Sequence, residues 1–115
     1  MKFAAIIVAG GRGERAGGEI PKQYTHLRAK PVLEWSAEAL FAAGAAEIVA
    51  VCAPEHAELC RNAVPDAGPV RIVTGGATRT ASVRSGLAAV QDAEAILIHD
   101  AARPGLDVSM IQSLL

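Results

Sequence analysis

The chain has 115 residues, enough for one domain with a single core. Hydrophobic residues make up 51% of it, which excludes an intrinsically disordered chain, and a formal net charge of −1 argues against a general nucleic-acid binder. No apolar run approaches the roughly 20 residues of a membrane span. The cysteines Cys52 and Cys60 match neither a disulfide framework nor a metal motif. We therefore expect a cytoplasmic protein in which both are reduced and buried.

Four short apolar runs, rich in Ile and Val and bounded by turn residues, predict β-strands. They span residues 3–9, 48–52, 70–74 and 95–99. Because these runs are continuous rather than alternating, we expect strands that are buried on both faces, as in a parallel sheet.

The segments between the runs predict helices. The first begins near Pro31 and ends at Gly44, and its apolar face comprises Leu33, Ala37, Leu40 and Phe41. The second covers about residues 55–63, and the fourth starts near residue 107 or 109. The third covers about residues 82–90, with Val83, Leu87 and Val90 on one side. This alternation predicts a right-handed, parallel α/β sandwich, whose ligand binds beyond the carboxyl ends of the strands.

A glycine-rich, cationic segment follows the first predicted strand. It reads Ala9-Gly10-Gly11-Arg12-Gly13-Glu14-Arg15, and Pro21-Lys22-Gln23-Tyr24 comes shortly after it. Glycines let backbone N–H groups approach an anion closely, and Arg12, Arg15 and Lys22 add positive charge. The segment predicts a triphosphate cradle, and a tight turn with solvated arginines is the structural alternative.

Two familiar phosphate motifs nearly fit this segment. Residues 11–16 satisfy the dinucleotide fingerprint, but the glycines at 17 and 18 and Pro21 break the helix that this fingerprint requires. The glycine spacing of a P-loop also occurs, but Glu19-Ile20 stands where Lys-Ser/Thr is needed. A dinucleotide-dependent dehydrogenase is therefore a weaker reading than a nucleotide-triphosphate site.

A second cluster follows the third strand. Gly75-Gly76 precede a run of hydroxyl residues, of which Thr80 or Ser82 is expected to cap the next helix. The start of that helix would attract an anion or a polar ligand.

A third cluster closes the fourth strand. Asp100 is a carboxylate at the mouth of the strand, where it can hold Mg²⁺ through oxygen or cap a turn. His99 should point to the opposite side, as a structural or orienting hydrogen-bond partner.

Taken in order, these motifs resemble the signature of the 2-C-methyl-D-erythritol 4-phosphate cytidylyltransferase family. They are Gly10-Gly11-Arg12-Gly13-Glu14-Arg15, Pro21-Lys22-Gln23-Tyr24, Gly75-Gly76-x-x-Arg79-x-x-Ser82-Val83 and His99-Asp100-Ala101-Ala102-Arg103-Pro104. The resemblance implies a Rossmann-like nucleotidyltransferase sandwich. It makes residues 1–115 the N-terminal nucleotide-binding part of a single cytidylyltransferase domain, truncated because family members are considerably longer.

The resemblance also implies an activity. CMP would pass from CTP to 2-C-methyl-D-erythritol 4-phosphate, giving 4-(cytidine 5′-diphospho)-2-C-methyl-D-erythritol and pyrophosphate, in non-mevalonate isoprenoid biosynthesis. The implied cofactor is Mg²⁺ or another divalent cation held by Asp100, the implied catalytic residues are Arg15 and Lys22, and the implied full-length form is a homodimer. The implied nucleotide-binding residues are Ala9, Gly10, Gly11, Arg12, Gly13, Gly75, Gly76, Ser82, Asp100 and Ala101.

Alternatives remain open at this point. A ribitol-5-phosphate cytidylyltransferase, or another sugar-phosphate nucleotidyltransferase, would use the same loops, although Tyr24 and Ala101-Ala102 favour the methylerythritol enzyme. A non-catalytic nucleotide-binding module is the alternative from another class. Some family members are fused to the next cyclase of the pathway, and the 115 residues alone are not expected to be a competent enzyme.

Overall fold

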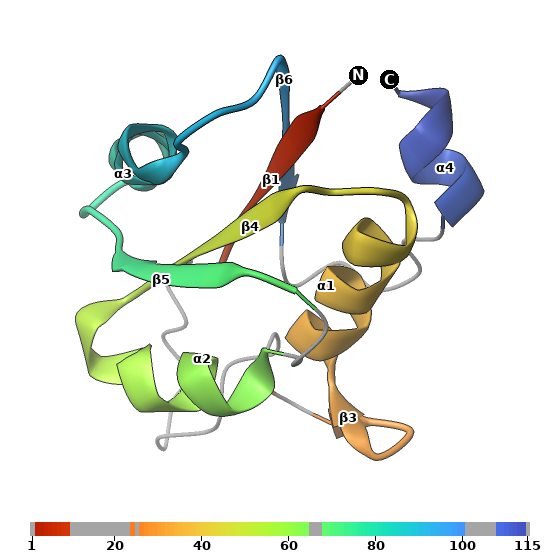
Figure 1. Ribbon diagram of the computed structural model, residues 1–115. Coiled ribbons are helices and arrows are strands. Elements are labelled where there is room, and N and C mark those ends of the chain that lie inside the picture. The colour runs from red at the N-terminus through yellow and green to blue at the C-terminus, as the bar shows by residue number, and fades with distance from the viewer. Residues whose placement is uncertain (1, 10–23, 25, 65–67, 101–107, 115) are drawn as a thin grey trace.

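The computed structural model describes residues 2–9, 24, 26–64, 68–100 and 108–114, and shows a parallel sheet covered by helices on both faces (Figure 1). The strands, in spatial order, are β5 (Val70–Thr74), β4 (Glu47–Cys52), β1 (Phe3–Val8) and β6 (Ala95–Asp100). One face carries α1 (Val32–Ala42), α2 (Ala57–Ala63) after a 3₁₀ turn (η3, Pro54–His56), and α4 (Val108–Ser113); the other carries α3 (Arg79–Ala89). The expected parallel α/β sandwich is confirmed.

The order of the strands switches beside β1. Strands β1, β4 and β5 step outward in one direction, and β6 then pairs with the opposite side of β1. In this register Val8 lies next to Val51 of β4 and next to Asp100 of β6. The carboxyl ends of these three strands therefore meet at the switch point, where open α/β sheets bind ligands.

Burial differs between the central and the outer strands. Every residue of β1 is buried, as the continuous apolar run predicts. For β5 and β6 the expectation of burial on both faces is wrong: Ile96 and Ile98 of β6 are 40% and 43% exposed. The reason is tertiary, because α3 packs mainly over β1, β4 and β5 and covers little of the outer strand β6.

Helix α1 begins and ends where its local sequence indicates. Pro31 precedes its first residue, and Leu33, Ala37 and Leu40 are fully buried. At its end Gly44 adopts φ +109°; its N–H donates to Phe41 O at 3.0 Å, while the N–H of the next residue donates to Leu40 O at 3.0 Å. These two bonds form a Schellman motif, which favours glycine at this left-handed position.

Helix α3 begins earlier than expected. Its N-cap is Thr78, whose Oγ1 accepts the N–H of Ala81 at 3.0 Å, and not Thr80 or Ser82. Ser82 is consequently inside the helix and buried, on the same side as Gly86. A Cβ atom at Gly86 would lie 2.7 Å from Ile6 Cγ2, so the helix lies close against the sheet. Leu87, expected on the buried side, is 42% exposed because the helix faces the sheet with its small residues.

A short hairpin precedes α1 and was not expected from the sequence. It pairs β2 (His26–Leu27) with β3 (Lys30–Pro31) through a turn in which Arg28 and Ala29 have φ of 53° and 75°. Non-glycine residues seldom adopt positive φ, so Arg28 and Ala29 carry no sequence signal for a turn. Among the described helices, none has the length and apolar composition that crossing a bilayer requires.

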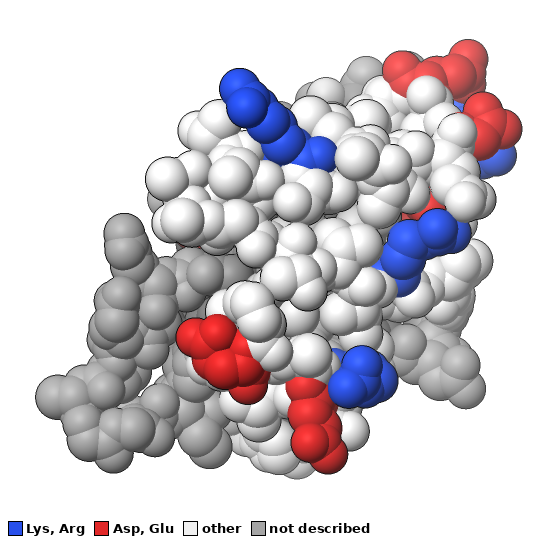
Figure 2. Space-filling model, turned by 90° about the vertical axis from the view of Figure 1, so that its left-hand side faces the viewer, with Lys and Arg blue, Asp and Glu red and all other residues white. Residues whose placement is uncertain are grey.

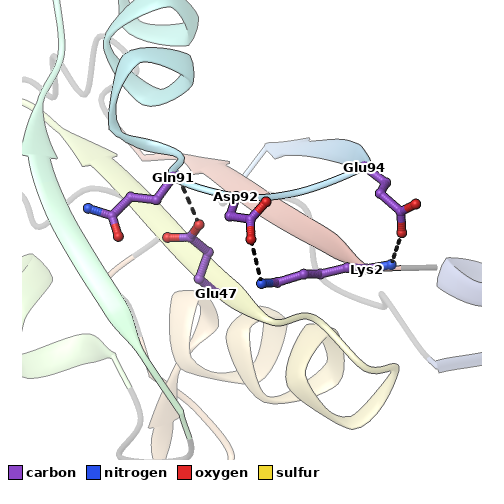
Figure 3. A network of polar contacts seen from close by, with 5 residues as sticks. All are labelled: Lys2, Glu47, Gln91, Asp92 and Glu94. Atoms are coloured by element: carbon purple, nitrogen blue, oxygen red, sulfur yellow. Dashed lines mark hydrogen bonds and ion pairs between the residues drawn. The ribbon is translucent and has the colours of Figure 1, made fainter.

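Polar contacts connect the opposite, amino-terminal edge of the sheet (Figure 3). The N–H of Lys2 donates to Glu94 Oε1 at 2.9 Å, its Nζ lies 3.2 Å from Asp92 Oδ2, and the N–H of Gln91 donates to Glu47 Oε2 at 3.0 Å. Figure 2 shows the side that carries α3 and β5, where acidic and basic side chains gather in small mixed groups with mostly uncharged surface between them. The exposed ion pair between Lys2 and Asp92 contributes only about 0–1 kcal/mol to the free energy of unfolding.

Candidate functional site

Backbone hydrogen bonds hold the carboxyl ends of the strands together. The N–H of Ala9 donates to Val51 O at 2.7 Å, and the N–H of Gly75 donates to Cys52 O at 2.8 Å. The segments that follow β1 and β5 thus leave the sheet on either side of the end of β4. Asp100 lies opposite Val8, so the end of β6 is adjacent. The structure therefore brings the starts of all three predicted clusters to one edge.

A hollow of about 340 Å³ opens at this edge, lined by Arg79, Ile98, His99 and Asp100. Arg79 is the first residue of α3 and Asp100 is the last residue of β6. The guanidinium and the positive amino terminus of α3 favour an anion, while the carboxylate favours a cation. An anion with its counter-cation, such as a metal-bound phosphate, suits this pairing of charges.

Gly75 lies directly against Ser82. Ser82 is 3% exposed, and a Cβ atom at Gly75 would lie 2.5 Å from its Oγ and 3.0 Å from Val51 Cγ1. A side chain at Gly76 would likewise collide with that of Ala81. The two glycines thus let the loop pass closely over the first turn of α3, and the Ser82 hydroxyl packs against Gly75 of this loop.

Five of the predicted site residues are described, and all lie at this edge: Ala9, Gly75, Gly76, Ser82 and Asp100. The amide of Ala9 is already used by Val51, so this residue anchors the start of the first loop. The other predicted residues lie outside the described part of the chain: Gly10, Gly11, Arg12, Gly13, Arg15, Lys22 and Ala101.

Comparison with known proteins identifies the family of the chain. The family model for 2-C-methyl-D-erythritol 4-phosphate cytidylyltransferase (IspD) matches residues 3–115. The chain belongs to this family.

Two curated relatives show how much of a family member the chain spans. It is 48% identical over 117 residues to the bifunctional enzyme IspD/IspF of Novosphingobium aromaticivorans, covering 100% of this chain and 30% of that protein. It is 44% identical over 126 residues to the 2-C-methyl-D-erythritol 4-phosphate cytidylyltransferase of Nitrosomonas eutropha, covering 100% of this chain and 53% of that protein. The chain therefore spans about half of a single-function relative and less than a third of a bifunctional one.

Solved structures share the fold. The 4-diphosphocytidyl-2C-methyl-D-erythritol synthase of Anaerococcus prevotii superposes with a TM-score of 0.78 at 24% identity, covering 96% of this chain and 48% of that one. Rv0371c of Mycobacterium tuberculosis, in complex with manganese, gives a TM-score of 0.73 at 20% identity, covering 98% of this chain and 57% of that one. These likenesses confirm the Rossmann-like nucleotidyltransferase architecture.

The cysteines of this IspD-family chain lie beneath the edge that carries the site. Cys52 ends β4 and Cys60 lies in α2; both are free and buried. Burial raises the pKa of both thiols, that of Cys60 to about 12, so they remain protonated and unreactive at neutral pH. The expectation that both cysteines are buried is confirmed. Tyr24, two residues after Lys22, is also buried, and its ring meets that of His56 edge-on at 5.7 Å.

One polar residue near the site escaped the sequence analysis. Ser36 lies on the buried face of α1, and its Oγ is 3.2 Å from Nε2 of His99. The available signal was a hydroxyl residue on a face otherwise built from Leu33, Ala37 and Leu40. Its partner could not be inferred, because the two residues are 63 positions apart.

Proposed function

We propose that the full-length protein transfers CMP from CTP to 2-C-methyl-D-erythritol 4-phosphate and releases pyrophosphate. Residues 1–115 would supply the N-terminal, nucleotide-binding part of a single cytidylyltransferase domain. Membership of the IspD family supports the proposal. The observation that carries it in the structure is that Ala9, Gly75 and Asp100 lie along the carboxyl edge of the sheet, which includes its switch point between β1 and β6.

The nucleotide would lie along the carboxyl edge of the sheet. The predicted glycine loop, with Gly10, Gly11, Arg12 and Gly13, would surround the triphosphate with N–H donors. Gly75, Gly76 and Ser82 would approach the cytidine, and Ala101 would follow Asp100 along the nucleotide. The close packing of Gly75 on Ser82 supports this role, since it holds the backbone of the loop close to Ser82 in the first turns of α3.

The reaction needs no covalent enzyme intermediate. An oxygen of the acceptor phosphate would attack the α-phosphorus of CTP in line. A new P–O bond forms, the bond from the α-phosphorus to its bridging oxygen breaks, and pyrophosphate leaves with the electron pair. Negative charge grows on the non-bridging and leaving oxygens, and Arg15 and Lys22 are the cations proposed to meet it.

A divalent cation fits Asp100, the carboxylate that the described residues bring to the site. Among the residues described here, no group of three or more His, Cys, Asp and Glu could hold a metal ion. Mg²⁺ needs no such group, because it is often held by one or two carboxylates together with substrate phosphates and water. Asp100 would hold the ion, which when bound would neutralise charge on the triphosphate. The manganese complex of the structural neighbour Rv0371c supports a divalent cation.

The homodimer and the cytoplasmic location belong to the same proposal. The homodimer follows from the resemblance to the family, and the cytoplasmic location from two cysteines that match no disulfide framework. Sedimentation of the full-length protein tests the dimer; a monomer at micromolar concentration would contradict it.

Substrate choice tests the proposal directly. The full-length protein should bind CTP with Mg²⁺ more tightly than ATP, GTP or NAD in calorimetry. It should release pyrophosphate faster with 2-C-methyl-D-erythritol 4-phosphate than with ribitol 5-phosphate. Tighter binding of NAD would support a dehydrogenase, faster turnover of ribitol 5-phosphate the related transferase, and absence of pyrophosphate release a non-catalytic module.

Substitution of the two proposed catalytic cations tests the mechanism. Because Arg15 and Lys22 would meet charge that develops in the transition state, Arg15→Ala and Lys22→Ala should lower kcat by about 10²–10³-fold, with a smaller rise in KM for CTP. Arg15→Lys should restore little, because an ammonium group lacks the two-pronged contact of a guanidinium. Arg12→Ala is the matched control and should be milder. Near-normal kcat in both alanine variants would refute the assignment.

A further inference from the structure

His99, the second-last residue of the outer strand β6, contacts helix α1. Its Nε2 lies 3.2 Å from Oγ of Ser36, a distance at which either group can donate, depending on the imidazole tautomer. In the parallel register His99 lies opposite Ile7, on the face of the sheet that α1 covers. The contact therefore joins an edge strand to the helical layer next to it.

The position of Ser36 makes this contact more than incidental. Ser36 is 2% exposed, on a helix face whose other residues are apolar. Burying a hydroxyl group without a hydrogen-bond partner is destabilising in proteins, so an alanine would serve the packing of α1 better. The hydrogen bond to His99 compensates for that burial, and it is available only when the end of β6 lies at this one place.

The residue after His99 is Asp100. Successive strand residues point to opposite faces, so Asp100 points toward the α3 side while His99 points toward α1. Among the described strands, β6 pairs with β1. His99 and Asp100 both line the 340 Å³ hollow. Because His99 and Asp100 are adjacent in the chain, a contact that holds the imidazole in place also fixes the position of the neighbouring carboxylate.

We propose that Ser36 and His99 are positioning residues of the nucleotide site. Their hydrogen bond fixes the carboxyl end of β6 against α1 and thereby aims Asp100 at the hollow beside Arg79. The inference rests on the proposed function, since it assigns to the pair an effect on cation-dependent CTP binding. Neither side chain needs to touch the nucleotide or the metal.

Calorimetric CTP titration of the full-length protein, with and without Mg²⁺, tests the proposal. Ser36→Ala should weaken CTP binding in the presence of Mg²⁺ by roughly threefold to tenfold, the scale of one hydrogen bond, and change binding without Mg²⁺ much less. His99→Ala should do the same, whereas His99→Gln, with a nitrogen donor near the place of Nε2, should restore part of the affinity. Ser85→Ala is the matched control, because Ser85 Oγ bonds only within α3, to Ala81 O at 3.2 Å.

A double-mutant cycle with Asp100→Asn separates positioning from general stabilisation. If the pair acts through Asp100, Ser36→Ala should cause no further loss of affinity in the Asp100→Asn background. Additive losses, or a lowered melting temperature with unchanged CTP affinity, would overturn the positioning role and leave the proposed function intact. If Asp100→Asn alone leaves Mg²⁺-dependent binding unchanged, both the positioning role and the metal role of Asp100 fail.

Discussion

Asp100 has two competing interpretations, as a ligand of a divalent cation and as the cap of a turn. Its place at the end of β6, on the wall of the hollow, suits a cation ligand as well as a turn cap. Asp100→Asn removes the charge and keeps the shape. We expect Mg²⁺-dependent CTP binding of the full-length protein to weaken about 10–100-fold, the scale of 1.5–3 kcal/mol for bonds to charged groups, with little change in melting temperature. A large loss of stability with normal Mg²⁺ dependence would show that Asp100 caps a turn.

Cys60 predicts a pH dependence of stability. Burial raises the pKa of its thiol from 9.0 to about 12 in the folded protein. The folded state therefore keeps a proton that the unfolded state loses, so this contribution is complete below about pH 9 and is lost as the pH rises toward 12. We expect the melting temperature to fall over this range, and to fall less steeply in Cys60→Ala, which has no thiol to titrate. Equal slopes in the two proteins would contradict the prediction.

At the scale of elements, the loop between β5 and α3 depends on its bare backbone. Gly75→Ala would place a methyl group 2.5 Å from Ser82 Oγ, and the loop must move away from α3 to accommodate it. We expect weaker CTP binding by calorimetry. The same clash should lower the melting temperature, and adding Ser82→Ala should restore part of it by removing the nearest atom, although Val51 Cγ1, at 3.0 Å, still crowds the position. A melting temperature that does not recover at all would contradict the steric explanation.

The end of α1 provides the contrasting element, important for stability and remote from the site. Gly44 adopts φ +109° at the Schellman motif, near the amino-terminal edge of the sheet. Gly44→Ala should lower the free energy of unfolding by about 1 kcal/mol, because a Cβ atom is strained in this conformation. Denaturant unfolding measures the loss. CTP affinity should be unchanged, and a change would show that this edge communicates with the site.

At the scale of the whole molecule, the chain spans 53% of the Nitrosomonas eutropha relative, and Ile96 and Ile98 expose apolar surface on β6. The resemblance to the family places acceptor-binding residues beyond these 115 positions. We expect the isolated 115-residue chain to show no turnover of CTP, in contrast to the full-length protein, because positioning both substrates supplies much of the rate. Measurable pyrophosphate release by the purified chain would refute this.

Features that depend on neighbouring residues were predictable from the sequence. Continuous apolar runs located β1 and β4, and Pro31 and Gly44 marked the two ends of α1. The order of the glycine and charged clusters after the strands indicated a nucleotide site at the carboxyl edge. Where the local signal was ambiguous the prediction failed: Thr78, not Thr80 or Ser82, caps α3.

Other features were decided only by the tertiary structure. The exposure of Ile96 and Ile98 follows from the position of α3 on the sheet, and the residue pattern within β6 does not indicate that position. The contact between Ser36 and His99 joins residues 63 positions apart. Sequence periodicity reports which face of an element is apolar, because that is a property of one segment. Which distant side chain meets a buried hydroxyl depends on the relative placement of two elements, and packing of the whole chain sets that placement.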